Sequence, residues 1–224
     1  MYGKLLNYEQ KGQTVILHYE KQSVRIQILT NEVINVFVPL SSDEHRSKAI
    51  EGEKELPTAF TLDRVEGCLV IATDSLICRI YDDFMIDFYD REGNLLCADY
   101  RGQREPRFVP KESFIELARQ EGHDVNDAGI LNHPVQCVKQ LDEADCIYGL
   151  GDKTGVLNKR FYEYENWNSD IPDPHEDCFK SLYKSIPFFI TLKEKGVYGI
   201  FYDNTFKSYF NFGKENHGYY SFGS

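Results

Sequence analysis

A period-two alternation of apolar and polar side chains dominates the first hundred residues and constrains the fold most strongly. Val24, Ile26 and Ile28, for example, alternate with Arg25 and Gln27. Comparable runs lie at 15–19, 34–38, 69–72, 76–81 and 85–89, separated by polar turns at 66–67, 73–74, 82–83 and 90–94. Such alternation is typical of strands with one buried face, and tight polar turns join antiparallel neighbours. Helical segments do not alternate with these runs, so the pattern excludes a parallel α/β sheet and predicts an all-β antiparallel β-sandwich.

The second half of the chain is less regular. Residues 101–133 are polar and broken by prolines, and we interpret them as an insertion between strands with one short helix at 112–119. Strands are predicted again at 135–139, 146–150, 188–192, 197–202, 209–212 and 219–222. Residues 151–187 show no strand alternation, and loops of this length in a compact domain are usually functional or disordered. Because this segment contains several aromatic residues, we expect an ordered, functional loop.

Composition and charge exclude several classes of protein. The chain has 224 residues, of which 42% are hydrophobic and 14% aromatic, which is too much core material for a disordered protein. A run of 18 apolar residues does not occur, so we expect no membrane partner. The net charge of −11 argues against a nucleic-acid partner, because phosphates require clustered Lys and Arg.

The six cysteines indicate a reducing compartment. Their positions are 68, 78, 97, 137, 146 and 178, and their spacing matches neither a CxxC motif nor a zinc site. The amino-terminal residues also lack the apolar core of an export signal. We therefore expect reduced thiols and a cytoplasmic location.

Two clusters look like chemical motifs at first. Gly149-Leu150-Gly151-Asp152-Lys153-Thr154-Gly155 follows a predicted strand, but its spacing fits neither a dinucleotide fingerprint nor a Walker loop. We interpret it as a strand-ending turn. The acidic segment from Asp170 to Cys178, with His175 inside it, matches no standard metal cage and contains two prolines, so we expect a polar surface loop without a metal.

Trp167 is the strongest candidate binding residue. It lies in the long loop beside Asn166, Asn168 and Asp170. An aromatic face that stacks on C–H groups, together with amides and carboxylates that bind hydroxyls, has the composition of a sugar subsite. A loop anchored by one buried Trp is the alternative interpretation.

A longer signature in the same region resembles a known family. It comprises Tyr148-Gly149-Leu150-Gly151-Asp152-Lys153-Thr154-Gly155, Lys159-Arg160, Tyr164, Trp167-Asn168-Ser169-Asp170, Pro172, Pro174-His175 and Leu182-Tyr183-Lys184-Ser185-Ile186-Pro187-Phe188. In order and spacing it resembles the N-terminal domain of glycoside hydrolase family 31, the α-glucosidases. The close match covers about residues 146–202. The family usually has Gly at the position of Phe161, often Met at that of Asn166, and more commonly Glu at that of Asp152.

The resemblance implies a fold and a role for the chain. The fold is a β-sandwich of the galactose-mutarotase type that precedes a (β/α)₈ barrel, and the barrel carries both catalytic aspartates of a retaining mechanism. A loop from the sandwich, here 151–187, reaches the active site, and its aspartate, here Asp170, binds hydroxyls of the leaving sugar. Because Trp167 is not followed by the W-x-D-M-N-E-like nucleophile motif, we expect no catalytic residue in this chain. We also expect no cofactor.

We therefore expect residues 1–224 to form one N-terminal sandwich domain cut from a longer α-glucosidase. Its expected partners are an α-glucoside and its own C-terminal barrel, and its expected substrate-binding residues are Asp170 and Trp167. An α-xylosidase parent and the linkage preference stay open. The alternatives are a stand-alone carbohydrate-binding sandwich and, less favoured, an aldose epimerase. An epimerase needs a His and a carboxylate as acid and base, and His18 is the one strand His, with no evident carboxylate partner.

Overall fold

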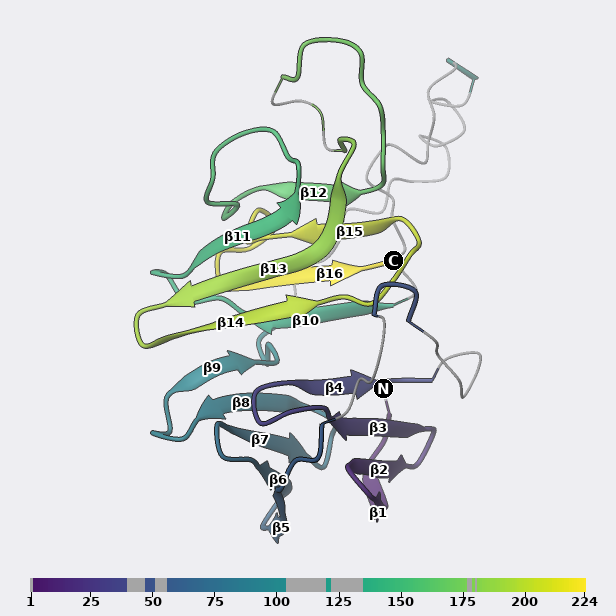
Figure 1. Cartoon of the computed structure of the whole chain (residues 1–224), viewed down its shortest axis with the longest axis vertical. Helices are drawn as coiled ribbons and strands as arrows, with labels where there is room; N and C mark the ends of the chain where they lie inside the picture. The colour runs from purple at the N-terminus through teal and green to yellow at the C-terminus, as the bar shows by residue number, and fades with distance from the viewer. Residues whose placement is uncertain are drawn as a thin grey trace.

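A computed structural model describes residues 2–39, 47–50, 56–103, 120–121, 135–176, 179 and 181–224. In these residues, strands β1 to β16 pair antiparallel throughout and form two stacked units (Figure 1). The prediction of an all-β antiparallel fold is confirmed. The predicted helix at 112–119 and most of the predicted insertion 101–133 lie outside the described residues. Within the described part, no helix is long and apolar enough to cross a membrane.

The N-terminal unit packs a four-stranded sheet against a five-stranded one. The first sheet has the order β1 (Leu5–Lys11), β2 (Thr14–Tyr19), β3 (Ser23–Ile28) and β4 (Ile34–Phe37). The second has the order β5 (Thr61–Val65), β6 (Cys68–Ala72), β7 (Leu76–Tyr81), β8 (Ile86–Asp90) and β9 (Leu95–Ala98). Their inner faces share an aliphatic core that includes Leu17, Ile26 and Ile80. The period-two pattern is the direct cause, because it places these side chains inward and their polar neighbours outward.

The C-terminal unit also consists of two sheets. One has the order β10 (Gln136–Gln140), β16 (Tyr219–Gly223), β15 (Ser208–Asn211) and β12 (Glu163–Asn166). The other has the order β11 (Cys146–Gly151), β13 (Ser185–Lys193) and β14 (Gly196–Phe201). Their shared core is aromatic: Phe189 is fully buried and its ring contacts those of Phe210, Phe212, Tyr220 and Phe222 at centroid distances of 5.0–6.1 Å.

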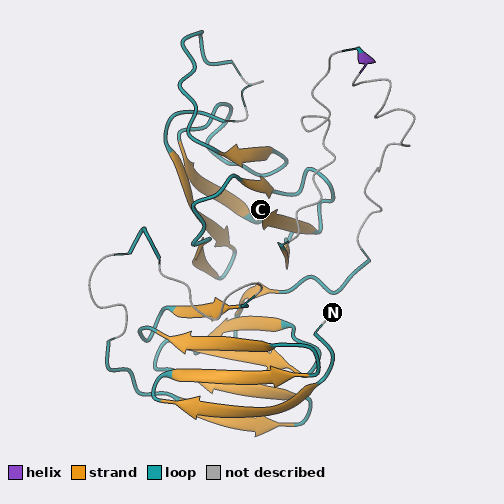
Figure 2. Ribbon diagram, turned by 90° about the vertical axis from the view of Figure 1, so that its right-hand side faces the viewer, coloured by secondary structure: helices purple, strands orange, loops and turns teal. Residues whose placement is uncertain are grey.

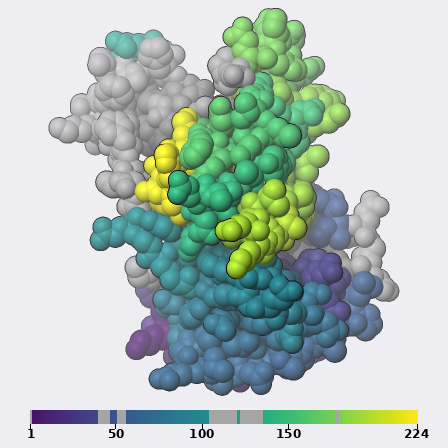
Figure 3. Space-filling model, turned by 90° about the vertical axis from the view of Figure 1, so that its left-hand side faces the viewer, coloured from purple at the N-terminus to yellow at the C-terminus, as the bar shows by residue number. Residues whose placement is uncertain are grey.

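A largely buried ion pair and a contact between a leucine side chain and a glycine join the two units, which Figure 2 shows one above the other. Lys139 Nζ of β10 lies 2.7 Å from Asp99 Oδ1 just after β9, with 13% and 19% of the two side chains exposed. The other carboxylate oxygen of Asp99 accepts a hydrogen bond from the Ile86 N–H. The side chain of Leu96 in β9 lies directly against Gly196 at the start of β14. Figure 3 shows the yellow-green β13–β14 segment next to the N-terminal unit. The units are therefore linked by specific contacts.

The prediction that residues 151–187 contain no strand is wrong for β12. This strand pairs with β15, matching Tyr164 with Phe210 and Asn166 with Ser208. The four residues supply two inward side chains, one of them the polar Asn166, so the apolar signal is too short for the sequence pattern to reveal. The residues before β12 are also packed, since Lys159 and Arg160 are buried.

The glycine-rich end of β11 is a structural bulge. Gly149, Leu150 and Gly151 all have positive φ, and the register with β13 shifts between the two glycines. A Cβ at Gly149 would meet the carbonyl oxygen of Phe188, and one at Gly151 the carbonyl oxygen of Lys184. The glycines therefore serve the close passage of β13. The predicted strand-ending turn is wrong for residues 149–151, which form a bulge inside β11, although the strand does end within the motif, at Gly151.

The described cysteines are free and differ in burial. Burial raises the pKa of the Cys78, Cys97 and Cys137 thiols above the ordinary value. Cys146 of β11 is partly exposed, and its strand partner in β13 is Leu192. Cys178 lies outside the described residues.

Candidate functional site

A loop of residues 167–184 leaves the edge strand β12 and returns to the start of β13. We call it the 167–184 loop; it rises above the C-terminal unit in Figure 1. Its described part from Asp170 to Glu176 is exposed apart from a half-buried Ile171. The segment that projects from the sheets is thus shorter than the predicted 151–187, because β12 and the residues before it belong to the sandwich.

Three hydrogen bonds tie the two arms of this loop together at its base. The Ser181 hydroxyl donates to the Trp167 carbonyl at 2.7 Å. The Ser185 N–H donates to Asn168 Oδ1 at 2.9 Å, and the Ser169 N–H to the Leu182 carbonyl at 3.3 Å. Such bonds fix where the loop leaves the sandwich, so the residues beyond them start from a defined position.

Lys153, which follows the β11 bulge, adds two further hydrogen bonds at the base of the loop. Its ammonium donates to the Glu165 carbonyl at 3.0 Å and to the Ser185 hydroxyl at 3.4 Å. Burial, followed by the nearby positive charge of Lys159, lowers the pKa of Lys153 to about 8. The ammonium therefore links β12 to β13, although its surroundings disfavour the charged form of the side chain.

Beside the base of the loop lies an open groove of about 530 Å³. It is lined by Ala49, Asn166, Trp167, Asn168, Ser185, Ile186, Pro187, Phe201, Asp203, Asn204, Thr205, Phe206 and Ser208. Trp167 and Phe206 are 53% and 77% exposed. Asn166 is 5% exposed, yet among the described residues neither polar atom of its side chain has a hydrogen-bond partner. Aromatic surface and unpaired amide groups together equip the groove to bind a ligand or another protein surface.

The structure separates the two predicted site residues. Trp167 lines the groove, whereas Asp170 lies farther along the loop and is not part of the lining. The alternative of a loop anchored by a buried Trp is wrong, since about half of Trp167 is exposed. Among the described residues, none donates a hydrogen bond to the Asp170 carboxylate, whose substrate-binding role stays a prediction.

Sequence reasoning missed the part of the groove formed by Phe201, Asn204 and Phe206. These residues lie more than thirty positions after Trp167 and reach it because β13 and β14 form a hairpin. An available signal was the loop Asp203-Asn204-Thr205-Phe206, which combines amide, carboxylate and aromatic groups after a predicted strand, as the Trp167 segment does.

The acidic segment of the loop shows no metal cage in its described part. His175 Nε2 is paired with the Ile171 carbonyl at 3.2 Å. Among the described residues, no three His, Cys, Asp or Glu side chains are grouped so that they could hold a metal ion. Asp177 and Cys178 lie outside these residues.

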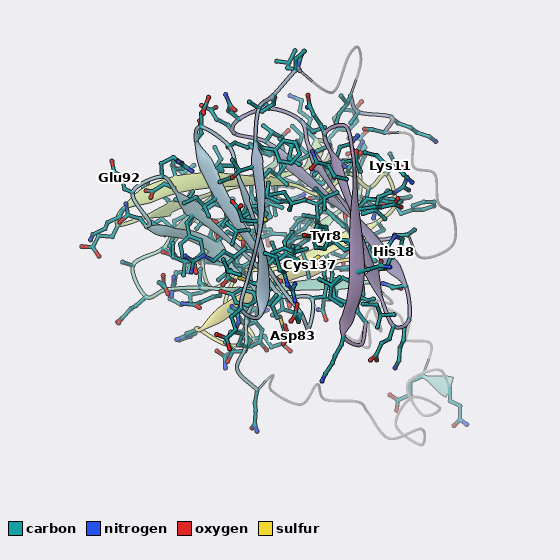
Figure 4. All side chains as sticks on the ribbon, turned by 90° about the horizontal axis from the view of Figure 1, so that it is seen from below. Tyr8, Lys11, His18, Asp83, Glu92 and Cys137 are labelled. Atoms are coloured by element: carbon teal, nitrogen blue, oxygen red, sulfur yellow. The ribbon has the colours of Figure 1, made fainter. Side chains whose placement is uncertain are left out.

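His18 does have a carboxylate partner, contrary to prediction. Its Nε2 lies 3.4 Å from Glu9 Oε1. Both side chains lie on the outer face of their sheet, with 37% of His18 and 43% of Glu9 exposed, and Figure 4 shows His18 on the same outer side of the molecule as Lys11. A pair on an open sheet face lacks the enclosed site that positions a sugar for proton transfer.

Among its described residues, the groove lacks the pair of carboxylates that glycoside cleavage needs. Retaining hydrolysis requires two carboxyl groups about 5 Å apart across the scissile bond. The described lining of the groove contains one carboxylate, Asp203, which accepts a hydrogen bond from Ser47 at 2.9 Å.

The sheets and the site define an antiparallel sandwich domain of the galactose mutarotase-like class. Residues 23–211 match the family described as "Glycosyl hydrolase 31 N-terminal galactose mutarotase-like domain", and the chain belongs to this family. The resemblance inferred from the Tyr148–Phe188 signature is thereby confirmed.

Relatives of the chain are much longer proteins. Alpha-glucosidase 2 of Bacillus thermoamyloliquefaciens is 27% identical over 212 residues, which cover 94% of this chain and 24% of that protein. The dextranase of Flavobacterium johnsoniae, solved with isomaltotriose, is 28% identical with a TM-score of 0.77, over 99% of this chain and 25% of that one. An α-xylosidase from a soil metagenome shares the fold at 14% identity and a TM-score of 0.62, over 96% of this chain and 30% of that one. The chain spans about a quarter of the length of the first two.

Proposed function

We propose that the chain is the N-terminal domain of a retaining α-glucosidase that releases glucose from the non-reducing ends of short α-glucosides. In this proposal the two units support a C-terminal (β/α)₈ barrel, which carries the catalytic carboxylates. The observation that carries the proposal is the 167–184 loop, which is tied at its base and presents Asp170 beyond the edge of the sandwich. The family and the α-glucosidase relative support it.

Asp170 acts in this proposal by binding the sugar that leaves. A carboxylate without a donor among the described residues is available to accept hydrogen bonds from sugar hydroxyls. The bonds at the base of the loop reduce the ordering cost of placing it in an active site. Trp167 contributes aromatic surface at the same base.

The proposal includes a cytoplasmic location. The described cysteines are free, and thiols stay reduced in the cytoplasm. Detection of the native protein in the cytoplasmic fraction after cell fractionation tests this part.

The decisive experiment replaces Asp170 in the longer enzyme. A hydrogen bond from a hydroxyl to a charged acceptor contributes about 1.5–3 kcal/mol. Asp170→Ala should therefore lower kcat/KM for maltose about 10- to 100-fold, but much less for an aryl α-glucoside whose leaving group offers no hydroxyls. Asp173→Ala is the matched control, because Asp173 is an exposed carboxylate of the same loop. Equal losses on both substrates, with an unchanged Tm, would show that Asp170 does not contact the leaving sugar.

A second candidate, a stand-alone carbohydrate-binding domain, is favoured by the unpaired amide of Asn166 in the groove. The chain contains a single Trp, so its fluorescence reports directly on Trp167. Our proposal predicts that maltose neither is cleaved by the 224-residue chain nor produces a saturable fluorescence change. A saturable change that Asn166→Ala abolishes would favour the second candidate.

A further inference from the structure

The outer face of β13 and β14 is apolar along its whole length. Phe189 and Thr191 of β13 point into the core, so the alternate residues point outward. The outward side chains of both strands are 38–57% exposed and comprise Ile186, Phe188, Ile190, Leu192, Val197 and Phe201. We call this set the outer β13–β14 face. Contiguous apolar surface of this kind marks an interaction site in a folded protein.

Strand β3 of the N-terminal unit shows the opposite pattern. In β3 the residues on either side of buried Ile26 are Arg25 and Gln27, which are polar and suited to water. In β13, by contrast, Ile186-Pro187-Phe188-Phe189-Ile190 is apolar on both faces. Strands that read as continuous apolar runs are typically covered on both sides. The sequence of β13 is thus that of an internal layer, although nothing described covers its outer side.

We propose that the outer β13–β14 face is the surface on which the catalytic barrel of the longer enzyme docks. This inference rests on the proposed function and assigns the barrel a specific contact surface on this domain.

Three observations favour the barrel as the occupant. Ile186 and Phe201 belong both to this face and to the groove that contains Trp167, so the face is continuous with the candidate site. The 167–184 loop returns directly into β13, which places a barrel seated here next to the loop. About three quarters of the length of the relatives lies outside the part that matches this chain. A second copy of the chain on this face would instead keep a barrel away from the loop.

The test replaces apolar residues of the face by charged ones and keeps the pairing of β13 with β14. Leu192 and Val197 are directly paired across β13 and β14. The double variant Leu192→Glu, Val197→Lys therefore places opposite charges side by side, where they stabilise each other. The matched control is Leu6→Glu, Val65→Lys, which changes two exposed apolar residues of the N-terminal unit.

Thermal unfolding and limited proteolysis of the longer enzyme provide the readout. In the wild type and the control, we expect the N-terminal domain and the barrel to unfold in one common transition. The Leu192→Glu, Val197→Lys variant should show a separate transition for this domain and at least a tenfold faster cleavage between the domains. In the 224-residue chain the same variant should leave Tm within a few degrees of the wild type and reduce binding of the apolar dye ANS. If the Tm of this variant falls by more than that, the milder double variant Leu192→Thr, Val197→Thr is used in the longer enzyme.

Unchanged coupling in the longer enzyme, with the variant chain folded, would overturn the proposal. It would also be overturned if the 224-residue chain formed a dimer that the variant dissociates while the longer enzyme stayed coupled, since the occupant would then be a second copy. Activity separates this inference from the proposed function. Uncoupling in an enzyme without α-glucosidase activity would support the docking face and refute the proposed substrate.

Discussion

The N-terminal and C-terminal units both consist of two packed antiparallel sheets, but they differ in the side chains of their cores and of their outer faces. Aliphatic side chains such as Leu17 and Ile26 fill the N-terminal core, whereas a cluster around Phe189 fills the C-terminal core. The outward residues of β3 are polar, and those of β13 and β14 are apolar. The groove and the 167–184 loop both lie with the C-terminal unit.

This difference assigns different tasks to the two units. The two sheets of the N-terminal unit bury their apolar inner faces against each other, and its exposed apolar residues, such as Leu6 and Val65, lie on different strands. The C-terminal unit has a filled core and a second apolar surface, which is the pattern of a layer between two others. In our proposal, the N-terminal unit supports the C-terminal unit, and the C-terminal unit contacts the catalytic barrel.

The largest expected effect comes from removing the centre of the aromatic core. Phe189→Ala should lower the free energy of unfolding by about 3–5 kcal/mol, and Leu17→Ala in the other core by about 2–5 kcal/mol. Urea denaturation of the 224-residue chain measures both. One common transition in each variant would show that the units unfold together. A larger loss for Leu17→Ala than for Phe189→Ala would contradict the expected order of the two effects.

The ion pair between the units should have the next largest effect. Lys139→Met leaves the Asp99 carboxylate in a largely buried position with one hydrogen bond, from the Ile86 N–H, and should cost about 3 kcal/mol. Lys214→Met is the matched control, since the pair of Lys214 with Glu163 is more exposed and its loss should cost less than about 1 kcal/mol. Denaturation with probes in each unit provides the measurement. Equal costs for the two variants would show that the junction adds little to the coupling of the units.

The smallest effect concerns Lys153 at the base of the loop. Its pKa in the folded chain is about 8, below the ordinary value of 10.5, so between these values the unfolded chain binds more protons. Stability should therefore rise with pH in this window and lie lower below pH 8. Relative to Lys153→Met, the wild type should gain about 1 kcal/mol between pH 8 and 9.5, allowing for partial solvent exposure.

Measuring the difference between wild type and variant cancels the contribution of other titrating groups. Lys195→Met, at an exposed position, should leave the pH dependence unchanged. A parallel pH dependence in the wild type and Lys153→Met would mean that the folded protein does not depress this lysine.

The sequence predicted the fold wherever side-chain alternation reflects burial. Runs such as 24–28 in the N-terminal unit and 188–192 in the C-terminal unit became strands because their apolar residues had a core to enter. β12 was missed because only Tyr164 and Asn166 point inward. The apolar outer residues of β13 look the same in sequence as its core residues, so their exposure became evident only in the structure.

The candidate site was predictable in its local part only. Trp167, Asn166 and Asn168 are neighbours in sequence and lie together along the groove. Asp170 is close in sequence but lies beyond the bonds that close the base of the loop, which separates it from the groove. Phe206 and Asn204 enter through the β13–β14 hairpin, a long-range pairing that residue spacing alone does not reveal.

The difference in reactivity among the thiols makes Cys146 a chemical probe of the outer β13–β14 face. Cys78 and Cys97 are buried and Cys137 is partly exposed, and the pKa of all three thiols is raised, so little of each is present as the reactive thiolate at neutral pH. Cys146, partly exposed and paired with Leu192, sits beside the outer β13–β14 face. In a Cys178→Ser background, the rate at which a maleimide alkylates Cys146 thus reports whether that face is open to solvent or shielded.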